Sequence, residues 1–363
     1  YSAAGKIKQA QQKDLGWLNE AGINYTHFND NYGSQENDVR AQSNWLIPAD
    51  DKQLKVDLNL SYFNNQYDSL YTGADSTQLY QQGTFVGQFR PHMSTALGNV
   101  IFDFGFNLFA VARTDSREEA RQNDLYFFPE ITATYTVVPG VLSVYGGIKG
   151  DLQRNTYRHL TRLNPFIMPG QNHLPERTTA LFAGLKGKLS SSTSFTLNGG
   201  YKQQNNLALS YRNPQFYIGN PAVGMQMVYT TVNMAYVQGE LSTNVNDNLL
   251  LSANALLRDM NSPGVNRPWY MPWFEGKVLA DYTWKEKIKI GTEIDLIGPR
   301  EAFNQLDNTA LESMLPGYVD AQLNLEYIYN SKISAFVKVS NLLNQQYDFY
   351  LGYRAQSINA VMG

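Results

Sequence analysis

The stretch Tyr318-Val-Asp-Ala-Gln-Leu-Asn-Leu-Glu-Tyr327 decides the fold, because apolar and polar side chains alternate along its whole length. Successive side chains of a β-strand point to opposite faces, so one face of this strand is apolar and the other is polar and charged. A two-residue turn, Asn330-Ser331, follows, and residues 332–342 continue the alternation. Residues 317–344 therefore predict an antiparallel hairpin with one wall suited to an apolar environment and one suited to water.

The composition of the chain fits a membrane-spanning sheet. Charged residues make up 17% of the 363 residues, against roughly 25% in ordinary soluble domains, and aromatic residues make up 13%. The mean hydropathy is −0.39, and no stretch approaches the ~20 consecutive apolar residues of a transmembrane helix. Low charge, many aromatics and repeated alternation are typical of an outer-membrane β-barrel, which is apolar outside and polar inside.

The alternating pattern recurs along nearly the whole chain. Strand pairs joined by short turns are predicted at 84–113, 125–153, 178–204, 228–258, 273–298 and 318–342, after earlier strands at 22–28, 39–47 and 54–62. Longer loops are predicted at 64–82, 114–123, 155–177, 205–227, 259–272, 299–316 and 348–356. Tight periplasmic turns that alternate with long extracellular loops are typical of outer-membrane barrels.

The predicted fold class is all-β, a closed antiparallel transmembrane β-barrel of about 16 strands. Residues 1–20 are predicted to form an N-terminal periplasmic segment and residues 21–363 the barrel. A soluble β-sandwich also alternates apolar and polar residues, but its strands usually run ~5–6 residues, and the predicted strands are longer. Localisation in the outer membrane of a Gram-negative cell follows from the barrel prediction.

The stretch Ser334-Ala-Phe-Val-Lys-Val-Ser-Asn-Leu-Leu-Asn-Gln-Gln-Tyr347 resembles the penultimate strand of TonB-dependent outer-membrane receptors. In that family an alternating strand runs into Asn-Leu, an apolar residue, Asn or Asp, and a Tyr three positions later. An Arg before the final strand is also typical. The positions that match are Asn341, Leu342, Leu343, Asn344, Tyr347 and Arg354.

This resemblance implies a receptor barrel and substrate uptake driven through TonB. It also implies a plug domain and a TonB-contacting segment ahead of the barrel. Strand-like sequence begins within the first thirty or so residues, so both are expected to be absent from this chain. The family's barrel has twenty-two strands, against the sixteen counted in the sequence pattern.

No catalytic or cofactor motif is recognisable. The chain lacks a Gly-rich phosphate loop and a nucleophile elbow, so neither an enzyme nor a cofactor is predicted. The absence of cysteine excludes disulfides and thiolate metal sites. His159 and His173 share one predicted loop with no carboxylate between them, so loop hydrogen bonding is favoured over a metal site. A net charge of −3 is too small to indicate a nucleic-acid partner.

The predicted lumen carries two groups of charges. The basic residues are Lys149, Lys186, Lys188 and Lys202, and the acidic residues are Glu293, Asp295, Asp320 and Glu326. Opposed basic and acidic walls tune ion selectivity in pores. Pairing among these side chains, or with a plug or an inserted loop, is the favoured alternative, because Lys277, Lys287 and Lys289 interrupt the acidic group.

Aromatic residues in the predicted loops are candidates for contact with a ligand or a partner. The residues are Tyr211, Phe216, Tyr217, Trp269 and Tyr270. They could stack on a sugar or a protein, or pack on each other over the barrel mouth. Residues 300–315 lack Gly and Pro, which predicts a short loop helix.

The leading hypothesis from the sequence is a receptor-like outer-membrane barrel that takes part in transport. The alternatives are a passive sixteen-stranded porin and a plugless barrel that serves as a structural subunit of an outer-membrane complex. The expected partners are outer-membrane lipid, the TonB system if the full protein has a plug, and other outer-membrane or periplasmic proteins.

Overall fold

A computed structural model describes residues 2–8, 17–31, 33–50, 52–67, 80–116, 118–170, 173–212, 224–263, 265, 267–306 and 309–363. The chain divides into two compact units. The first unit contains Tyr1–Thr134, Gly147–Ala180 and Gln204–Thr231, and the second contains Tyr135–Gly146, Leu181–Gln203 and Val232–Gly363. Several long strands therefore begin in one unit and end in the other.

Within the described residues, sixteen strands form an up-and-down antiparallel sheet. They are β2 (Leu18–Asn29), β3 (Gln35–Ala49), β4 (Lys52–Tyr67), β5 (Tyr80–Leu97), β6 (Val100–Asp115), β7 (Glu118–Val138), β8 (Leu142–Gln153), β9 (Glu176–Lys188), β10 (Thr193–Arg212), β11 (Met225–Asn246), β12 (Leu249–Asn261), β13 (Phe274–Trp284), β14 (Ile288–Ile297), β17 (Tyr318–Asn330), β18 (Ile333–Ser340) and β21 (Asn359–Met362). Most of these strands exceed the ~9–11 residues that cross a bilayer at a tilt.

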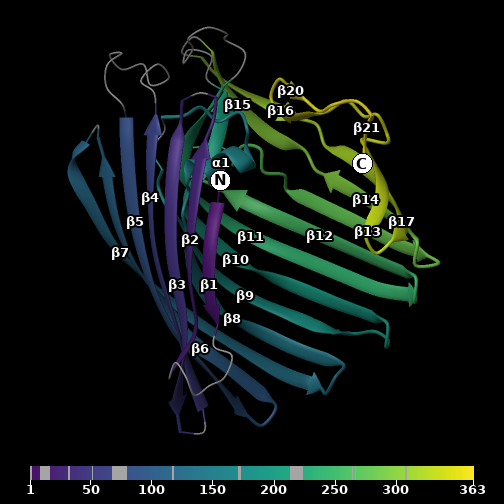
Figure 1. Cartoon of the computed structure of the whole chain (residues 1–363), viewed down its shortest axis with the longest axis horizontal. Coiled ribbons are helices and arrows are strands. Elements are labelled where there is room, and N and C mark those ends of the chain that lie inside the picture. The colour runs from purple at the N-terminus through teal and green to yellow at the C-terminus, as the bar shows by residue number, and fades with distance from the viewer. Residues whose placement is uncertain are drawn as a thin grey trace. The chain divides into compact units, whose positions relative to one another are not determined.

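In the first unit, β2 to β6 pair in sequence order and run side by side (Figure 1). The register places Gln42 opposite Asn59 and Asn59 opposite Gln88. Residues directly opposite each other share a face of the sheet, so these three amides lie on one polar face. The other face carries large apolar side chains that are exposed, namely Val39, Leu58, Leu60, Tyr62, Phe85 and Phe89.

In the second unit, β11 to β14 pair in order and β14 then pairs with β17 (Figure 1). The hairpin predicted for residues 317–344 is present as β17 and β18, and β18 pairs with β21. Val278, Ile294 and Ala321 lie opposite one another on the apolar face. Lys277, Asp295 and Asp320 lie opposite one another on the polar face.

The exposed apolar face indicates which environment the sheet requires on that side. Leu60 is 53% exposed and Leu125 is 69% exposed, although both sit within long strands. Soluble proteins rarely expose a contiguous apolar surface of this extent, whereas a transmembrane barrel places such a surface against lipid. Within the described residues, no helix is long and apolar enough to cross a membrane.

The predicted short turns are confirmed, but the predicted loops at 114–123 and 205–227 are partly strand, because β10 continues to Arg212 and β11 begins at Met225. The strands end and restart around Gly98, Gly140 and the pair Lys285-Glu286, as the sequence pattern indicated. Residues 114–123 were expected to form a long loop, but β6 continues to Asp115 and β7 begins at Glu118. A polar composition is compatible with either a loop or a polar strand, so composition alone did not separate the two here.

The predicted helix at 300–315 is also wrong. This segment forms a hairpin of β15 (Arg300–Leu306) and β16 (Thr309–Leu315), paired from Arg300 with Leu315 to Leu306 with Thr309. Arg300 and Ala302, two positions apart, are both buried. A burial period of two favours a strand over a helix, and helix propensity alone did not reveal it.

Four further elements lie outside the sixteen strands. β1 (Ser2–Lys8) pairs antiparallel with β2, from Ser2 with Thr26 to Lys8 with Glu20. The division of the chain at residue 20 and the periplasmic side of this segment stay predictions. α1 (Tyr157–Leu163) lies between β8 and β9. β19 (Asp348–Tyr350) and β20 (Tyr353–Arg354) form a short hairpin in the predicted 348–356 loop.

The turn between β13 and β14 yields a stability prediction. Lys285 and Glu286 have φ angles of 51° and 59°, in the left-handed region that favours glycine. Replacing Glu286 with Gly should raise the free energy of unfolding by about 1 kcal/mol, because the side chain no longer opposes this backbone conformation. Urea unfolding of the protein in detergent micelles, followed by tryptophan fluorescence, measures the change.

Gly98 provides a control for which the expected change in the free energy of unfolding has the opposite sign. It has a φ of 59° and no atom within 4 Å of an added Cβ, so Gly98→Ala tests the backbone effect without a steric clash. This variant should lower the free energy of unfolding by about 1 kcal/mol. If both variants shifted stability in the same direction, left-handed strain would not be the cause.

Candidate functional site

The segment between β8 and β9 folds onto the polar face of the first unit. This β8–β9 segment, residues 154–175, contains α1. The Thr156 hydroxyl caps the helix by accepting a hydrogen bond from the His159 backbone N–H at 3.2 Å. Threonine is a favoured N-cap residue, because its side chain satisfies one of the unpaired N–H groups of the first turn. A capped helix of seven residues still needs tertiary contacts to persist.

An ionic anchor ties the start of this segment to β3. The Arg154 guanidinium donates to both oxygens of the Asp38 carboxylate, at 2.9 and 3.1 Å. Arg40 donates to the same carboxylate from Nε at 2.8 Å and from a terminal nitrogen at 2.6 Å. Asp38 is 1% exposed, and a buried carboxylate is tolerated only when it is paired and hydrogen-bonded in this way.

A tyrosine–histidine cluster holds the rest of the segment. The Tyr157 ring meets the Tyr67 ring edge-on at 5.6 Å, and Tyr67 stacks on Tyr80 at 5.5 Å. The Tyr67 hydroxyl is hydrogen-bonded to Nε2 of His173, and the Tyr157 hydroxyl donates to Asp30 at 2.7 Å. These contacts join the segment to the ends of β2, β4 and β5.

The two histidines of this segment make the hydrogen bonds expected of loop histidines. His173 contacts Tyr67, and Nε2 of His159 lies 2.6 Å from the side-chain nitrogen of Gln153. Burial lowers the pKa of the His159 imidazole, which favours its neutral form. Within the described residues, no group of three histidines or carboxylates is arranged to hold a metal ion.

The lumen-lining role of the four predicted lysines stays a prediction. Lys149 belongs to the first unit and is exposed. The remaining three belong to the second unit. Lys186 lies over the Tyr145 ring at 5.9 Å, Lys188 is exposed, and Lys202 is half-buried.

The four predicted acidic residues are on neighbouring strands, and lysines contact three of them. Lys277 forms an ion pair with Glu293 and lies 3.1 Å from Asp295. Lys289 lies 3.5 Å from Glu326 on the adjacent strand. Asp320 faces Asp295 directly across β14 and β17. The charges on this face are therefore largely neutralised in place, as expected from the lysines that interrupt the acidic group in the sequence.

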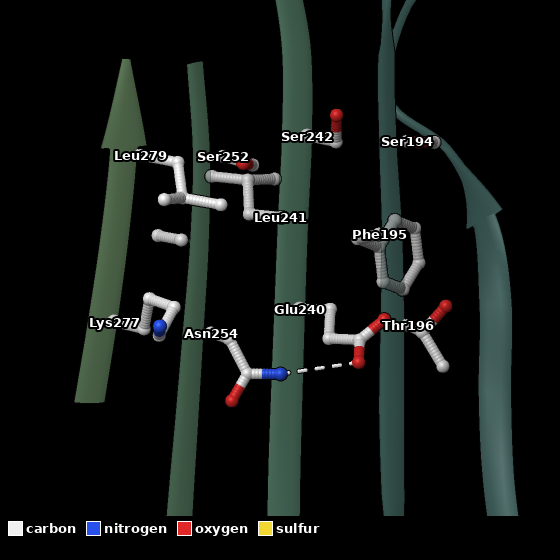
Figure 2. Close-up of a pocket in the computed structure, with 11 residues that line it drawn as sticks. Ser194, Phe195, Thr196, Glu240, Leu241, Ser242, Ser252, Asn254, Lys277 and Leu279 are labelled. Carbon is white, nitrogen blue, oxygen red and sulfur yellow. Dashed lines mark hydrogen bonds between the residues drawn. The ribbon is translucent and has the colours of Figure 1, made fainter. Parts of the chain in front are cut away.

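A hollow of about 260 Å³ lies on the polar face over β10 to β13 (Figure 2). Glu240, Asn254 and Lys277 point into it, and the Asn254 amide donates to the Glu240 carboxylate at 3.1 Å. The remaining lining is mostly small hydroxyl residues and leucines, including Ser242, Ser252 and Leu279. Balanced charge and small size make this a water-accessible recess with no strong preference for a ligand charge.

The loop aromatics that the structure describes are packed against other side chains. Trp269 is 7% exposed and stacks on Phe303 at 4.4 Å. Tyr270 meets Tyr350 edge-on at 5.0 Å, and the Tyr211 hydroxyl donates to Gln226 at 2.7 Å. Phe216 and Tyr217 lie outside the described residues. Of the two sequence-based readings, these contacts correspond to aromatics that pack on each other.

The motif that carries the family resemblance folds the loop after β18. Asn341 is buried, has a φ of 51°, and donates to the backbone oxygens of Gln345 at 3.0 Å and Gln356 at 2.8 Å. Its side-chain oxygen accepts the Gln345 N–H at 3.0 Å. Asn344 also has a positive φ, of 48°, and accepts the Ile358 N–H at 3.2 Å.

The aromatic end of the motif packs on β17. Tyr347 stacks on Tyr318 at 3.8 Å, and Arg300 lies over the Tyr318 ring at 5.0 Å. Burial raises the pKa of the Tyr347 hydroxyl. Leu342 donates its backbone N–H to Ala321, whereas Arg354 is exposed and lies 3.8 Å from Asp348. The motif residues therefore direct the chain from β18 to β21, which is an architectural role.

No protein-family model matches the sequence, and no curated protein sequence matches it. Solved structures do match. The ferripyoverdine receptor of the Pseudomonas aeruginosa outer membrane superposes with a TM-score of 0.66 at 13% identity, over 99% of this chain and 55% of the receptor. The copper transporter OprC gives 0.66 at 13% identity, over 99% and 63%. The ferric citrate transporter FecA gives 0.62 at 11% identity, over 99% and 60%.

Together, the sheet and these matches define the class of the protein as an all-β, antiparallel barrel of the outer-membrane type. More particularly, the fold is that of the barrel of TonB-dependent receptors, as the Asn341–Tyr347 motif predicted. The chain spans about 55–63% of the length of the receptors it matches. At 11–13% identity the likeness establishes the fold, and the activities of those receptors remain theirs.

Removing the central carboxylate of the ionic anchor should release the β8–β9 segment. In Asp38→Asn, two arginines lose their common partner, which should cost about 3 kcal/mol and expose α1. Limited trypsin digestion measures the release, because Arg158 and Arg162 become cleavable. Asp124 on β7 forms an ion pair with Arg113 on β6. Asp124→Asn is therefore the matched control, and it should leave Arg158 and Arg162 protected from trypsin. Equal protection of Arg158 in Asp38→Asn would contradict the anchor.

Replacing the first residue of the motif should destabilise the loop after β18. Asn341→Ala loses three hydrogen bonds and places alanine at a left-handed φ, so the free energy of unfolding should fall by about 3 kcal/mol. The neighbouring Leu342→Ala should change it by less than about 1 kcal/mol, because that side chain is exposed. Urea unfolding in micelles compares the two variants, and similar losses would argue against the architectural role.

Proposed function

We propose that this chain is the barrel portion of an outer-membrane receptor that takes part in transport, driven through TonB in the full-length protein. The observation that carries the proposal is the fold match, which extends over 99% of the chain to the ferripyoverdine receptor and two transporters. The Asn341–Tyr347 motif supports it independently, because the resemblance of these residues to the receptor family rests on sequence alone.

The exposed apolar face supports an outer-membrane location, since a sheet with Leu60, Leu125 and Phe127 exposed requires lipid on that side. The polar face supports a water-filled or protein-filled interior. Its ion pairs and amide contacts match what a polar barrel interior requires, because unpaired buried charges are costly. A non-enzymatic role is part of the proposal, in keeping with the transporters that share the fold.

The β8–β9 segment favours a restricted interior over a wide pore. Its buried side chains on the polar side of the first unit include Tyr157, Leu160 and Ile167. A segment held by an ionic anchor and an aromatic cluster narrows the space that a passive porin leaves open. This observation favours the receptor over the porin, and it is also compatible with a barrel that serves as a sealed structural subunit.

Conductance of the full-length protein in a planar bilayer tests the proposal, together with its intact mass. A receptor should show no steady conductance and a mass that exceeds this chain by ~150 residues or more, roughly the size of a plug domain. Steady conductance in proportion to salt, without the added mass, would overturn the receptor in favour of a porin. A sealed barrel without the added mass would favour the structural subunit, and co-purifying outer-membrane or periplasmic proteins would then identify the complex.

A further inference from the structure

A second hollow, of about 320 Å³, lies on the polar face of the first unit at the root of the β8–β9 segment. Two arginines, Arg40 and Arg154, line one side, and three amides, Gln42, Asn59 and Gln88, line the floor. Phe109 and Leu152 supply an apolar side. Its volume is at the lower end of the range of small-molecule sites, ~300–1,000 Å³, so it fits a small ligand.

The charge of this hollow is positive. Asp38 bears one negative charge, and it is shared between two guanidinium groups, which leaves a net charge of +1. Four hydrogen bonds from Arg40 and Arg154 occupy the two carboxylate oxygens. Among the described residues, none of those that line the hollow is acidic. A cation would therefore meet two arginines and a carboxylate whose oxygens are already engaged.

Arg40 retains hydrogen-bonding capacity toward a ligand. A guanidinium carries five N–H donors, and Arg40 uses its Nε and one terminal nitrogen on Asp38. Its side chain is 47% exposed, in contrast to the 12% exposure of Arg154. Arg40 is thus fixed in orientation by Asp38 and still presents donors to solvent, which is the arrangement that pre-organises an arginine for a carboxylate or phosphate.

A row of hydrogen bonds fixes the orientation of the amide side chains on the floor of the hollow. Asn59 donates to Gln88 at 2.8 Å, Gln88 donates to Asn107 at 2.9 Å, and Asn107 donates to the buried backbone oxygen of Gly150 at 3.1 Å. Because a backbone oxygen only accepts, the whole row points one way. The side-chain oxygen of Asn59 is therefore left as an acceptor at the hollow, where a hydroxyl group can donate to it.

We propose that this hollow binds a small hydroxylated oxyanion. The Arg40 guanidinium contacts the carboxylate or phosphate, Asn59 and Gln42 contact hydroxyl groups, and Phe109 with Leu152 covers the carbon skeleton. The proposal rests on the proposed function, because it names the chemical class of solute that this interior would favour. The same guanidinium recognises carboxylates and phosphates, so both sources of the oxyanion are compared in the test.

Isothermal titration of the full-length protein in detergent tests the site with three polyhydroxylated six-carbon probes. Gluconate and glucose 6-phosphate carry the oxyanion, and glucose does not. Gluconate or glucose 6-phosphate should bind at least about tenfold more tightly than glucose, because hydrogen bonds to charged groups supply the difference. The tighter of the two anions identifies the source. Equal affinity for all three probes, or no binding by either anion, would overturn the proposal.

Two variants and a control locate the binding. Arg40→Gln should weaken binding of the preferred anion about tenfold. Asn59→Asp places a negative charge at the floor while leaving the Asp38 anchor intact, so it should abolish anion binding even if Arg40→Gln perturbs folding. Lys55→Gln removes one positive charge from the same face of β4 without lining the hollow. A loss in Lys55→Gln as large as in Arg40→Gln would assign the effect to general charge and refute the site.

Uptake of the preferred anion by cells that make the protein separates the site from the proposed function. Binding that is lost in Asn59→Asp, without uptake, would support the site and contradict transport of that anion. Uptake that persists unchanged in Asn59→Asp would support transport and refute the site.

Discussion

The structure depends on a constraint that lipid imposes on a polypeptide. A backbone that crosses hydrocarbon must pair every N–H and C=O with another protein group, and long antiparallel strands meet this requirement through their neighbours. The pairing of β2 to β6 is continuous over most of each strand. The same holds for β12 with β13, β13 with β14, and β14 with β17. Once the register is set, every second side chain faces lipid, and a slip of one residue would bring Asn59 and Asp57 into the apolar face.

The polar face has a different requirement, because charges that are removed from bulk water need partners. In this sheet the partners are ion pairs between side chains on different strands. Lys277 on β13 contacts Glu293 and Asp295 on β14, and Lys289 on β14 contacts Glu326 on β17. Arg90 on β5 reaches Glu130 on β7 at 2.5 Å. Each of these pairs places opposite charges next to each other, so that the charged groups on this face have partners.

The β8–β9 segment uses the same polar face for a different purpose. Asp38 binds Arg154 across 116 residues of sequence, and Tyr157 reaches Asp30 across 127. The anchor that fixes the segment also orients Arg40, so the position of the segment and the chemistry of the hollow beneath it are linked. Arg40 shares the Asp38 carboxylate with Arg154, the first residue of the segment. A solute that binds Arg40 would therefore contact part of the anchor that holds the segment.

The sequence by itself determined the strands, most turns and the family of folds, because side-chain alternation and turn residues are local signals. The motif from Asn341 to Tyr347 was also readable, although only the structure showed that its hydrogen bonds are architectural. Only the tertiary structure decided the conformation and contacts of segments that depend on residues far away in the sequence. Residues 300–315 became a hairpin that packs Phe303 on Trp269, and Trp269, one of the predicted loop aromatics, is buried by this contact. The Asp38 anchor joins residues whose spacing carries no periodic signal, so no reading of the chain in order could have paired them.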